Sequence, residues 1–296
     1  MESRQILALG FFDGVHTGHG ALLRACRVLA DKAGLPAGAV TFSVHPDALV
    51  SGAAPGLINT PADRERLMRD LYGLDNVITL PFDEAMMHMR WQDFFRLLTT
   101  EYGAAGLVCG HDFRFGDRGA GNAALLESAC RDALIPCVVV PEQKIDGITV
   151  SSTYIRSLIA TGNMEQAVRF LGHPHIFTGT VTRGHQIGRT LGIPTANLHL
   201  PEGLLCPRKG VYAAAACIDG RKYPAVTNVG TRPTVNGVHL TVEPWILDFD
   251  GDLYGRELTL EFHRFLRPEE KFPSLEALQA EILKNAAETQ EFFGNS

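Results

Sequence analysis

Long hydrophobic runs, paired cysteines and blocks of basic residues are all missing from this sequence of 296 residues. No apolar stretch reaches the roughly 18 residues that a membrane-spanning helix needs, and Met1-Glu2-Ser3-Arg4 does not begin a signal peptide. The six cysteines form no CxxC pair, and we interpret them as reduced core residues. The net charge of −6 is spread along the chain, without the basic stripe of a nucleic-acid-binding protein. We therefore predict a cytoplasmic protein without a membrane or nucleic-acid partner.

Three common catalytic motifs are also absent. No GxxxxGK[ST] sequence is present, so the chain has no P-loop. No HExxH zinc motif occurs, because the two neighbouring histidines His16 and His19 are three residues apart and have no Glu between them. No lysine run of the KMSKS kind occurs, which argues against a fragment of an aminoacyl-tRNA synthetase.

The periodicity of the apolar residues divides the chain into two predicted domains. Up to residue 171, short apolar runs alternate with amphipathic stretches, which predicts a mostly parallel α/β sheet of the Rossmann-like kind. From residue 172 the period changes from about 3.6 to 2, and five or six β-rich segments follow, separated by turn residues. These predict a small antiparallel β-barrel with a helix at 275–286 packed on it. We place the domains at 1–171 and 172–296.

The segment 6–24 predicts an anion site at the start of the chain. An apolar strand at 6–9 runs through a Gly-rich turn into a helix, whose first N–H groups and dipole favour a bound phosphate. His16 and His19 lie on one face of the first turn, where both can donate hydrogen bonds to the same phosphate. The alternative is a capped helix with two surface histidines. The candidate phosphate-binding residues of this turn are Gly10, Phe12, Asp13, Gly14 and Gly18.

Two later segments of the first domain carry further candidates. Asp112, Phe113 and Arg114 follow a predicted strand, where a doubly wound sheet places its ligand contacts; the alternative is a loop held by packed phenylalanines. At 150–156, Ser152 and Thr153 start a helix that has Arg156 in its first turn. This arrangement suits a second phosphate site, or simply a helix cap.

The second domain has three chemically suggestive features. A Gly-rich loop at 183–192, with Gly184 and Gly188, would let backbone N–H groups approach phosphates. Thr195 and Asn197 offer hard oxygen ligands for Mg²⁺, or form a turn with a side-chain cap. Glu243 lies in an apolar run, where it would serve as a general base or simply face solvent on an edge strand.

Together these motifs resemble the bacterial bifunctional riboflavin kinase/FMN adenylyltransferases, also called FAD synthetases. The resemblance rests on GFFDGVHTGHG at 10–20 with its HxGH pattern, GHDFRFG at 110–116, SSTYIR at 151–156, GIPTAN at 192–197, NVGTRPT at 228–234 and FLRPEEKF at 265–272. These segments follow one another in the order of that family and span nearly the whole chain.

The resemblance implies two ATP-dependent reactions. In the barrel, Glu243 would deprotonate the ribityl hydroxyl of riboflavin, and Thr195 and Asn197 would hold Mg²⁺ and the ATP phosphates. In the first domain, His16, His19 and Arg156 would stabilise adenylyl transfer from ATP to FMN, with Ser152 and Thr153 on the other side of the phosphates. The implied flavin contacts are Asp112, Phe113, Arg114 and Arg267, and the implied phosphate contacts include Gly184 and Gly188.

Two other interpretations stay open. One is a monofunctional adenylyltransferase whose barrel only binds a ligand, against which the intact Pro194-Thr195-Ala196-Asn197 and Glu243 count. The other is a non-catalytic flavin sensor, which would tolerate the loss of His16, His19 and Glu243. The sequence leaves the oligomeric state open, a homo-oligomer included.

Overall fold

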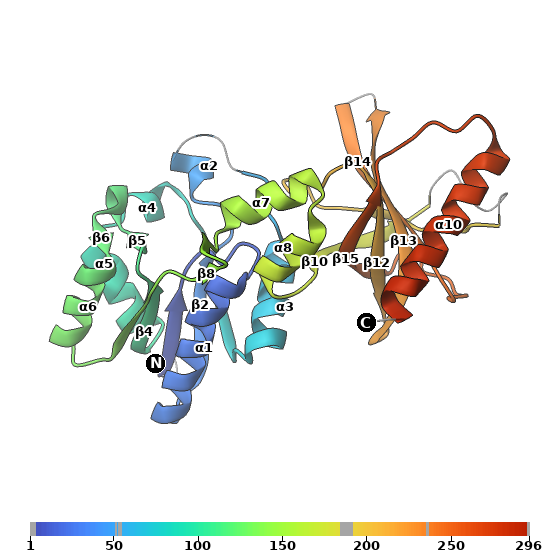
Figure 1. The fold of residues 1–296 in the computed structure, drawn as a ribbon. Coiled ribbons are helices and arrows are strands. Elements are labelled where there is room, and N and C mark those ends of the chain that lie inside the picture. The colour runs from blue at the N-terminus through green and yellow to red at the C-terminus, as the bar shows by residue number, and fades with distance from the viewer. Residues whose placement is uncertain (1–3, 51, 53–54, 184–191, 235–236, 295–296) are drawn as a thin grey trace. The chain divides into compact units, whose positions relative to one another are not determined.

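The computed structural model describes residues 4–50, 52, 55–183, 192–234 and 237–294. The chain separates into two compact units (Figure 1), and each is considered by itself. The first comprises Met1–Leu57 and Pro61–Ser152, and the second comprises Ile58–Thr60 and Thr153–Ser296. Helix α7, Ser152–Thr161, begins where the first unit ends.

A five-stranded parallel sheet forms the centre of the first unit, with strand order β3-β2-β1-β4-β7. Its strands are β1 Gln5–Leu9, β2 Ala37–Phe42, β3 Asn76–Leu80, β4 Ala104–Gly110 and β7 Cys137–Val140. The first strand of the chain is the middle strand and is fully buried, as its unbroken apolar run predicts. The predicted parallel α/β sheet is therefore confirmed.

Helices and two small hairpins surround this sheet. The elements are α1 Thr17–Ala33, α2 Asp47–Val50, α3 Pro61–Tyr72, α4 Glu84–Met87, α5 Trp91–Arg96, the π-helix η1 Leu97–Glu101, the 3-10 turn η2 Asp117–Gly119, α6 Ala123–Asp132, and the short strands β5 Arg114–Phe115, β6 Gly121–Asn122, β8 Lys144–Ile145 and β9 Ile148–Thr149. Leu7 and Leu9 share a core with Phe94, Leu98 and Leu126 of α5, η1 and α6. Helix α1 packs on β1 and β4.

The apolar residues from 83 to 102 recur at helical spacing, which predicts a single helix, but that prediction is wrong. The segment instead forms α4, α5 and η1, with a break around Met89. The Met89 carbonyl accepts a hydrogen bond of 2.7 Å from the N–H of Asp117, and Gly116 packs closely on Trp91. The loop at Gly116 and Asp117 thus packs at the break between the helices. Helical periodicity does not encode such a tertiary contact.

The second unit is an antiparallel barrel, closed in the described part of the chain by strands in the order β10-β11-β14-β13-β12-β15. Its elements are α8 Met164–Leu171, β10 His175–Thr182, β11 Asn197–His199, β12 Gly210–Ile218, β13 Arg221–Thr234, β14 Gly237–Ile246, β15 Glu257–Arg267 and α10 Leu275–Gly294. Helix α10 packs on β12 and β13, so the predicted barrel with its C-terminal helix is confirmed.

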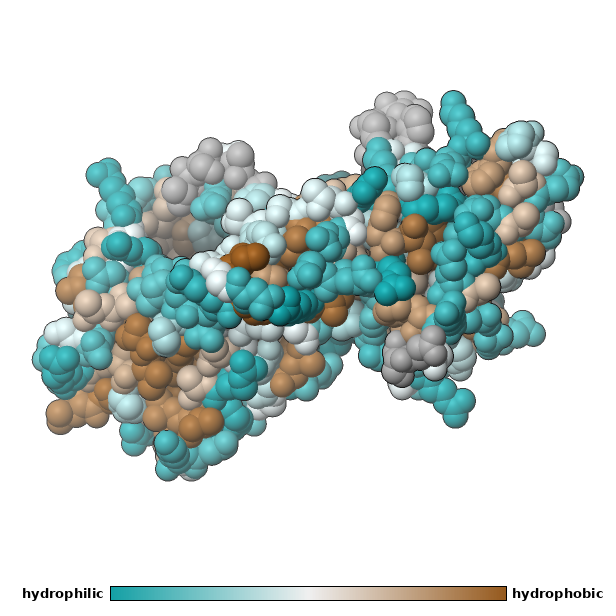
Figure 2. All heavy atoms as spheres, in the orientation of Figure 1, coloured by the Kyte–Doolittle hydropathy of each residue, from teal (hydrophilic) through white to brown (hydrophobic). Residues whose placement is uncertain are grey.

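The surface agrees with this architecture. Hydrophilic residues predominate along α10 in Figure 2, with apolar residues among them; Leu275 and Leu283 of this helix are exposed. Among the described residues, no helix combines the length and apolar character needed to cross a membrane. All six cysteines are free, and Cys206 is exposed rather than in the core.

A buried histidine makes the barrel sensitive to acid. His175 is fully buried against the rings of Phe177 and Phe262, and neither of its ring nitrogens has a hydrogen-bond partner within the described residues. Burial, with a smaller contribution from His173, lowers the pKa of His175 to about 3. The imidazole is therefore neutral in the folded barrel but takes up a proton in the unfolded chain below about pH 6.5.

We expect the barrel to lose about 2 kcal/mol of unfolding free energy from this group between pH 6.5 and pH 5, because only the unfolded state gains the proton. Urea unfolding, followed by Trp245 fluorescence in a Trp91→Phe background, would measure it. The variant His175→Phe should lack this part of the pH dependence. Equal pH dependence with and without His175 would contradict the prediction.

Candidate active sites in the two units

The turn between β1 and α1 has an unusual backbone. Phe12, Gly14 and Val15 all have positive φ, at 59°, 80° and 40°. Phe12 and Val15 are fully buried, so side-chain packing holds two non-glycine residues in a conformation that they would otherwise avoid. Asp13 is also buried, at 2% exposure. The turn is therefore fixed before any ligand binds.

His16 and His19 lie together at the start of α1. His16 is the N-cap residue, and its Nδ1 accepts a hydrogen bond of 3.1 Å from the His19 N–H. The two rings stack with centroids 3.5 Å apart and an angle of 12° between their planes. Burial, then the neighbouring charges of His16 and Arg64, lower the pKa of His19. At neutral pH the His19 ring is thus an uncharged hydrogen-bonding group rather than an imidazolium.

Glycine is required beside these rings. A Cβ at Gly18 would come within 3.1 Å of the His16 ring, and one at Gly10 would come within 3.0 Å of the Phe12 ring. The HxGH spacing therefore has a steric reason in this structure, because a side chain at Gly18 would disturb the stacked pair.

Two further residues of the first unit approach this turn. The Ser152 hydroxyl donates a hydrogen bond of 2.9 Å to the Asp13 carbonyl, and so joins the start of α7 to the β1–α1 turn. Arg64 of α3 lies near Asp13 and His19, and sequence reasoning missed it because a helix of charged residues suggests a surface. Thr153 and Arg156, exposed and half-buried on α7, belong to the second unit, and their part in this site stays a prediction.

The segment after β4 borders an apolar pocket of about 560 Å³. Phe113 and Phe115 stack with centroids 5.3 Å apart, and Arg114 is exposed beside them. The pocket lining also includes Phe42, Phe82, Met86 and Met89. Asp112 is exposed and does not line the pocket.

In the barrel, strand pairing brings the predicted kinase residues together. Thr195 lies opposite Trp245 and Leu198 opposite Val242, so the same register places Asn197 opposite Glu243. Asn228 of β13 lies opposite Glu243 on its other side. Directly paired residues project to the same face of a sheet, so Glu243 is flanked by two carboxamides. Asn228 belonged to a recognised motif, but sequence reasoning gave it no role.

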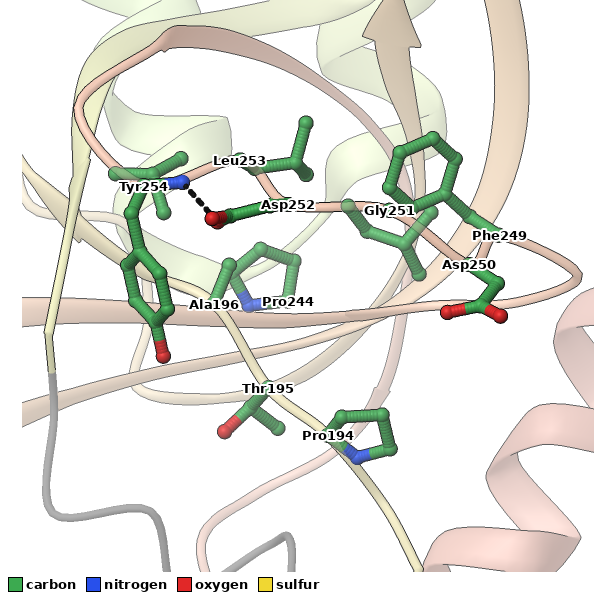
Figure 3. Close-up of a pocket in the computed structure, with 12 residues that line it drawn as sticks. Pro194, Thr195, Ala196, Pro244, Phe249, Asp250, Gly251, Asp252, Leu253 and Tyr254 are labelled. Atoms are coloured by element: carbon green, nitrogen blue, oxygen red, sulfur yellow. Dashed lines mark hydrogen bonds between the residues drawn. The ribbon is translucent and has the colours of Figure 1, made fainter.

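A pocket of about 440 Å³ opens at the Thr195 end of this strand pair. Figure 3 shows the hydroxyl groups of Thr195 and Tyr254 pointing to the same side of it. Asp252 accepts a hydrogen bond of 3.0 Å from the Tyr254 N–H, and the Arg183 guanidinium lies 5.4 Å from the Tyr254 ring. The pocket contains Thr195 but neither Asn197 nor Glu243.

The remaining candidates lie apart from this face or outside the described residues. Arg267, at the end of β15, is held by Asn285 at 3.0 Å and by Glu281 at 3.6 Å, both on α10, and stacks over Phe272. It therefore fixes the segment that follows β15 against α10. Gly184 and Gly188 lie outside the described residues.

The two arrangements suit different phosphate chemistries. The first unit has a rigid turn, a helix N-terminus and two imidazoles, which together stabilise charge on a phosphate. The barrel has a carboxylate between carboxamides and a nearby hydroxyl, which can accept a proton and orient a substrate.

Comparison with known proteins agrees with this division. The FAD synthetase family matches residues 1–154, and the riboflavin kinase family matches residues 171–293. A bifunctional riboflavin kinase/FMN adenylyltransferase of Listeria monocytogenes is 32% identical over 99% of this chain and 93% of its own. The Escherichia coli protein of the same name is 35% identical over 98% of this chain and 93% of its own.

A solved structure extends the similarity to the fold. The crystal structure of a Streptococcus pneumoniae protein named macrolide-efflux protein has a TM-score of 0.88 and 31% identity, covering 98% of this chain and 95% of that one. With both family matches and whole-length relatives at more than 30% identity, this chain belongs to the bifunctional riboflavin kinase/FMN adenylyltransferases, the enzymes that phosphorylate riboflavin with ATP and convert FMN to FAD.

Proposed function

We propose that each unit carries out one of the two reactions. The first unit transfers the adenylyl group of ATP to FMN at the β1–α1 turn, and the barrel phosphorylates riboflavin at the face that carries Glu243. The observation that carries this proposal is the pairing of Glu243 between Asn197 and Asn228, in a unit separate from the stacked His16 and His19. The domain boundary that we propose, between residues 171 and 172, adds α7 and α8 to the adenylyltransferase domain, although both helices cluster with the second unit.

In adenylyl transfer, the FMN phosphate attacks the α-phosphate of ATP, and pyrophosphate leaves. His16 and His19 stabilise the charge that develops on the transferred and leaving phosphates, as do the N–H groups at the start of α1. Ser152, Thr153 and Arg156 act from the other side. A phosphate monoester is itself a nucleophile, so no covalent enzyme intermediate is needed.

In riboflavin phosphorylation, Glu243 accepts the proton of the ribityl hydroxyl as that oxygen attacks the γ-phosphate of ATP. Asn197 and Asn228 orient Glu243 and the hydroxyl. The Thr195 hydroxyl and the Asn197 amide oxygen are hard donors that would hold Mg²⁺ together with the ATP phosphates, and such an ion neutralises phosphate charge. We place the base of ATP in the pocket between Thr195 and Tyr254, and we assign Arg267 to positioning the flavin-side segment.

The apolar pocket beside Phe113 suits the flat flavin ring of FMN. Its volume of about 560 Å³ and its aromatic and methionine lining fit a large planar ring, and Arg114 at its edge offers a positive charge. Asp112 lies outside the pocket, so we give it a role at the loop rather than in ring binding.

Phe113→Ala should raise the KM for FMN in FAD formation about tenfold, because stacking on an aromatic ring contributes on the order of 1 kcal/mol. Steady-state assays with varied FMN at saturating ATP would measure it. Val28→Ala, which shortens an exposed side chain on α1, is the matched control and should change nothing. An unchanged KM for FMN in Phe113→Ala would show that the flavin ring does not bind in this pocket.

The proposal as a whole is tested by product analysis of purified protein with riboflavin, ATP and Mg²⁺. We expect FMN first and FAD later, with ADP and pyrophosphate as co-products. FAD made from FMN without any FMN made from riboflavin would leave the barrel as a binding module. We also propose a cytoplasmic location, in keeping with six free cysteines, and leave the oligomeric state to solution measurement.

A further inference from the structure

The first unit contains a fully buried arginine that the mechanism above does not use. Arg64 lies in the first turn of α3 and is 1% exposed, although its neighbours in the sequence, Glu65 and Arg66, extend toward solvent. A cationic side chain is almost never buried in this way unless it is paired. The surroundings of Arg64 therefore call for an explanation.

Protein groups satisfy only part of the Arg64 guanidinium. Its Nη2 donates a hydrogen bond of 2.6 Å to the Phe42 carbonyl, and its Cζ lies 4.4 Å from the centroid of the Phe11 ring. Within the described residues, Nε and Nη1 have no hydrogen-bond partner, and Arg64 forms no salt bridge. Two donor nitrogens of the planar group, on different edges, are thus unused.

The Arg64 guanidinium lies beside the proposed adenylyl-transfer site. Its contacts lie on Phe11, which belongs to the β1–α1 turn, and at the end of β2, next to that turn. Its positive charge interacts with His19 and with the buried Asp13. Burial lowers the pKa of Arg64 to about 10, which leaves it protonated at neutral pH.

A buried cation with unused donors is costly unless something fills them. Leaving buried polar groups unsatisfied is rare in folded proteins, and an uncompensated buried charge is more expensive still. A bound phosphate would supply an acceptor oxygen and the missing negative charge, which makes a strong charge-assisted hydrogen bond. The neighbouring helix N-terminus and imidazoles favour the same ligand.

We propose that Arg64 binds a phosphate group of the substrates directly through an unused guanidinium donor, and so completes the anion site of His16 and His19. The inference rests on the proposed assignment of adenylyl transfer to this turn. The phosphate is either the monoester of FMN or part of the triphosphate of ATP, and the chemistry of recognition is the same for both.

The test uses the full-length chain with Arg64→Gln, Arg64→Lys and the control Arg66→Gln. Arg66 is on the same helix, but its side chain is 41% exposed and paired with Asp63 at 3.0 Å. Each variant is assayed for FAD formation with FMN and ATP varied in turn, and for the rise in melting temperature caused by pyrophosphate. The rate of riboflavin phosphorylation by each variant shows whether its barrel is still folded and active.

We expect Arg64→Gln to lower kcat/KM for FAD formation about 10- to 100-fold and to abolish the pyrophosphate-dependent rise in melting temperature. Arg64→Lys should recover only part of either, because it keeps the charge but not the fixed directions of the guanidinium donors. Arg66→Gln should match the wild type. A rise in the KM for FMN alone assigns the FMN phosphate, and a rise in the KM for ATP alone assigns the triphosphate.

Wild-type kinetics and an unchanged pyrophosphate response in Arg64→Gln would overturn the proposal. If that variant does not fold, the wild-type protein decides. With ¹⁵N-arginine labelling, the Arg64 Nε–H resonance must shift as pyrophosphate or FMN is added, and a resonance that saturation with either ligand leaves unmoved overturns the proposal. His19→Ala separates the two levels of inference. If it keeps FAD formation, the proposed function itself fails; if it loses FAD formation while Arg64→Gln does not, only the role of Arg64 fails.

Discussion

Replacing His19 with alanine should lower the rate of FAD formation from FMN and ATP about a thousandfold. The stack on His16 and the packing against Phe12 hold the His19 ring in place, so in the proposed reaction the ring would not have to reorient when the substrates bind. Removing one such preorganised donor costs about 100- to 1,000-fold in comparable sites. Because the pKa of His19 is lowered, its ring is already neutral at pH 6.5. The rate should therefore not fall as the pH rises through 6.5.

The bifunctional chain supplies its own control for this variant. Riboflavin phosphorylation by His19→Ala should equal that of the wild type, since the barrel is a separate unit. Arg66→Gln controls for loss of a polar side chain in the same unit. Quantifying FMN and FAD by chromatography, from riboflavin in one assay and from FMN in another, separates the two reactions. A rate of FAD formation within tenfold of the wild-type rate would show that His19 does not take part in the reaction.

Glu243→Gln should produce the opposite pattern: FMN formation from riboflavin falls by about 100- to 10,000-fold, while FAD formation from added FMN is unchanged. The substitution keeps the size and the hydrogen-bonding shape of the side chain between Asn197 and Asn228 but removes its ability to accept a proton. General base catalysis contributes about that factor in rate.

A second glutamate of the barrel is the matched control. Glu257 begins β15 and is exposed, so Glu257→Gln should leave both reactions unchanged. The measurement is the initial rate of ADP formation that depends on riboflavin. If Glu243→Gln phosphorylates riboflavin at the wild-type rate, the proton goes elsewhere, and the carboxylate only shapes the site.

The regular elements were predictable because their apolar patterns are long and unambiguous. The continuous apolar run of β1 corresponds to a fully buried strand, and that of β12 to a strand buried along nearly its whole length. Short or interrupted elements were not. The break at Met89 depends on a hydrogen bond from Asp117, and the three-residue β11 becomes a strand only by pairing with β10 and β14. Contacts between distant segments set these features, and local periodicity does not contain them.

The candidate site residues, too, were predictable only where a local sequence pattern marks them. Spacing within short motifs was enough to predict five of the candidate residues: His16, His19, Thr195, Asn197 and Glu243. Arg64 and Asn228 were not assigned, because what marks them is their position against another segment: a buried guanidinium in an otherwise charged helix, and a carboxamide opposite Glu243 on a neighbouring strand. Side-chain burial and strand register were needed to find them.

The hydrogen bond from Ser152 to the Asp13 carbonyl has a consequence for biosynthesis. Its partners are 139 residues apart, and β1, the first strand to be synthesised, must wait for β4 to complete its pairing in the middle of the sheet. At about 5 to 20 residues per second on the ribosome, this hydrogen bond cannot form until roughly 7 to 28 s after Asp13 has been added. Until β4 emerges, one edge of the buried strand β1 is unpaired, so nascent chains of this protein should engage chaperones until β4 has left the exit tunnel. The turn gains its contact with Ser152 only when the start of α7 follows.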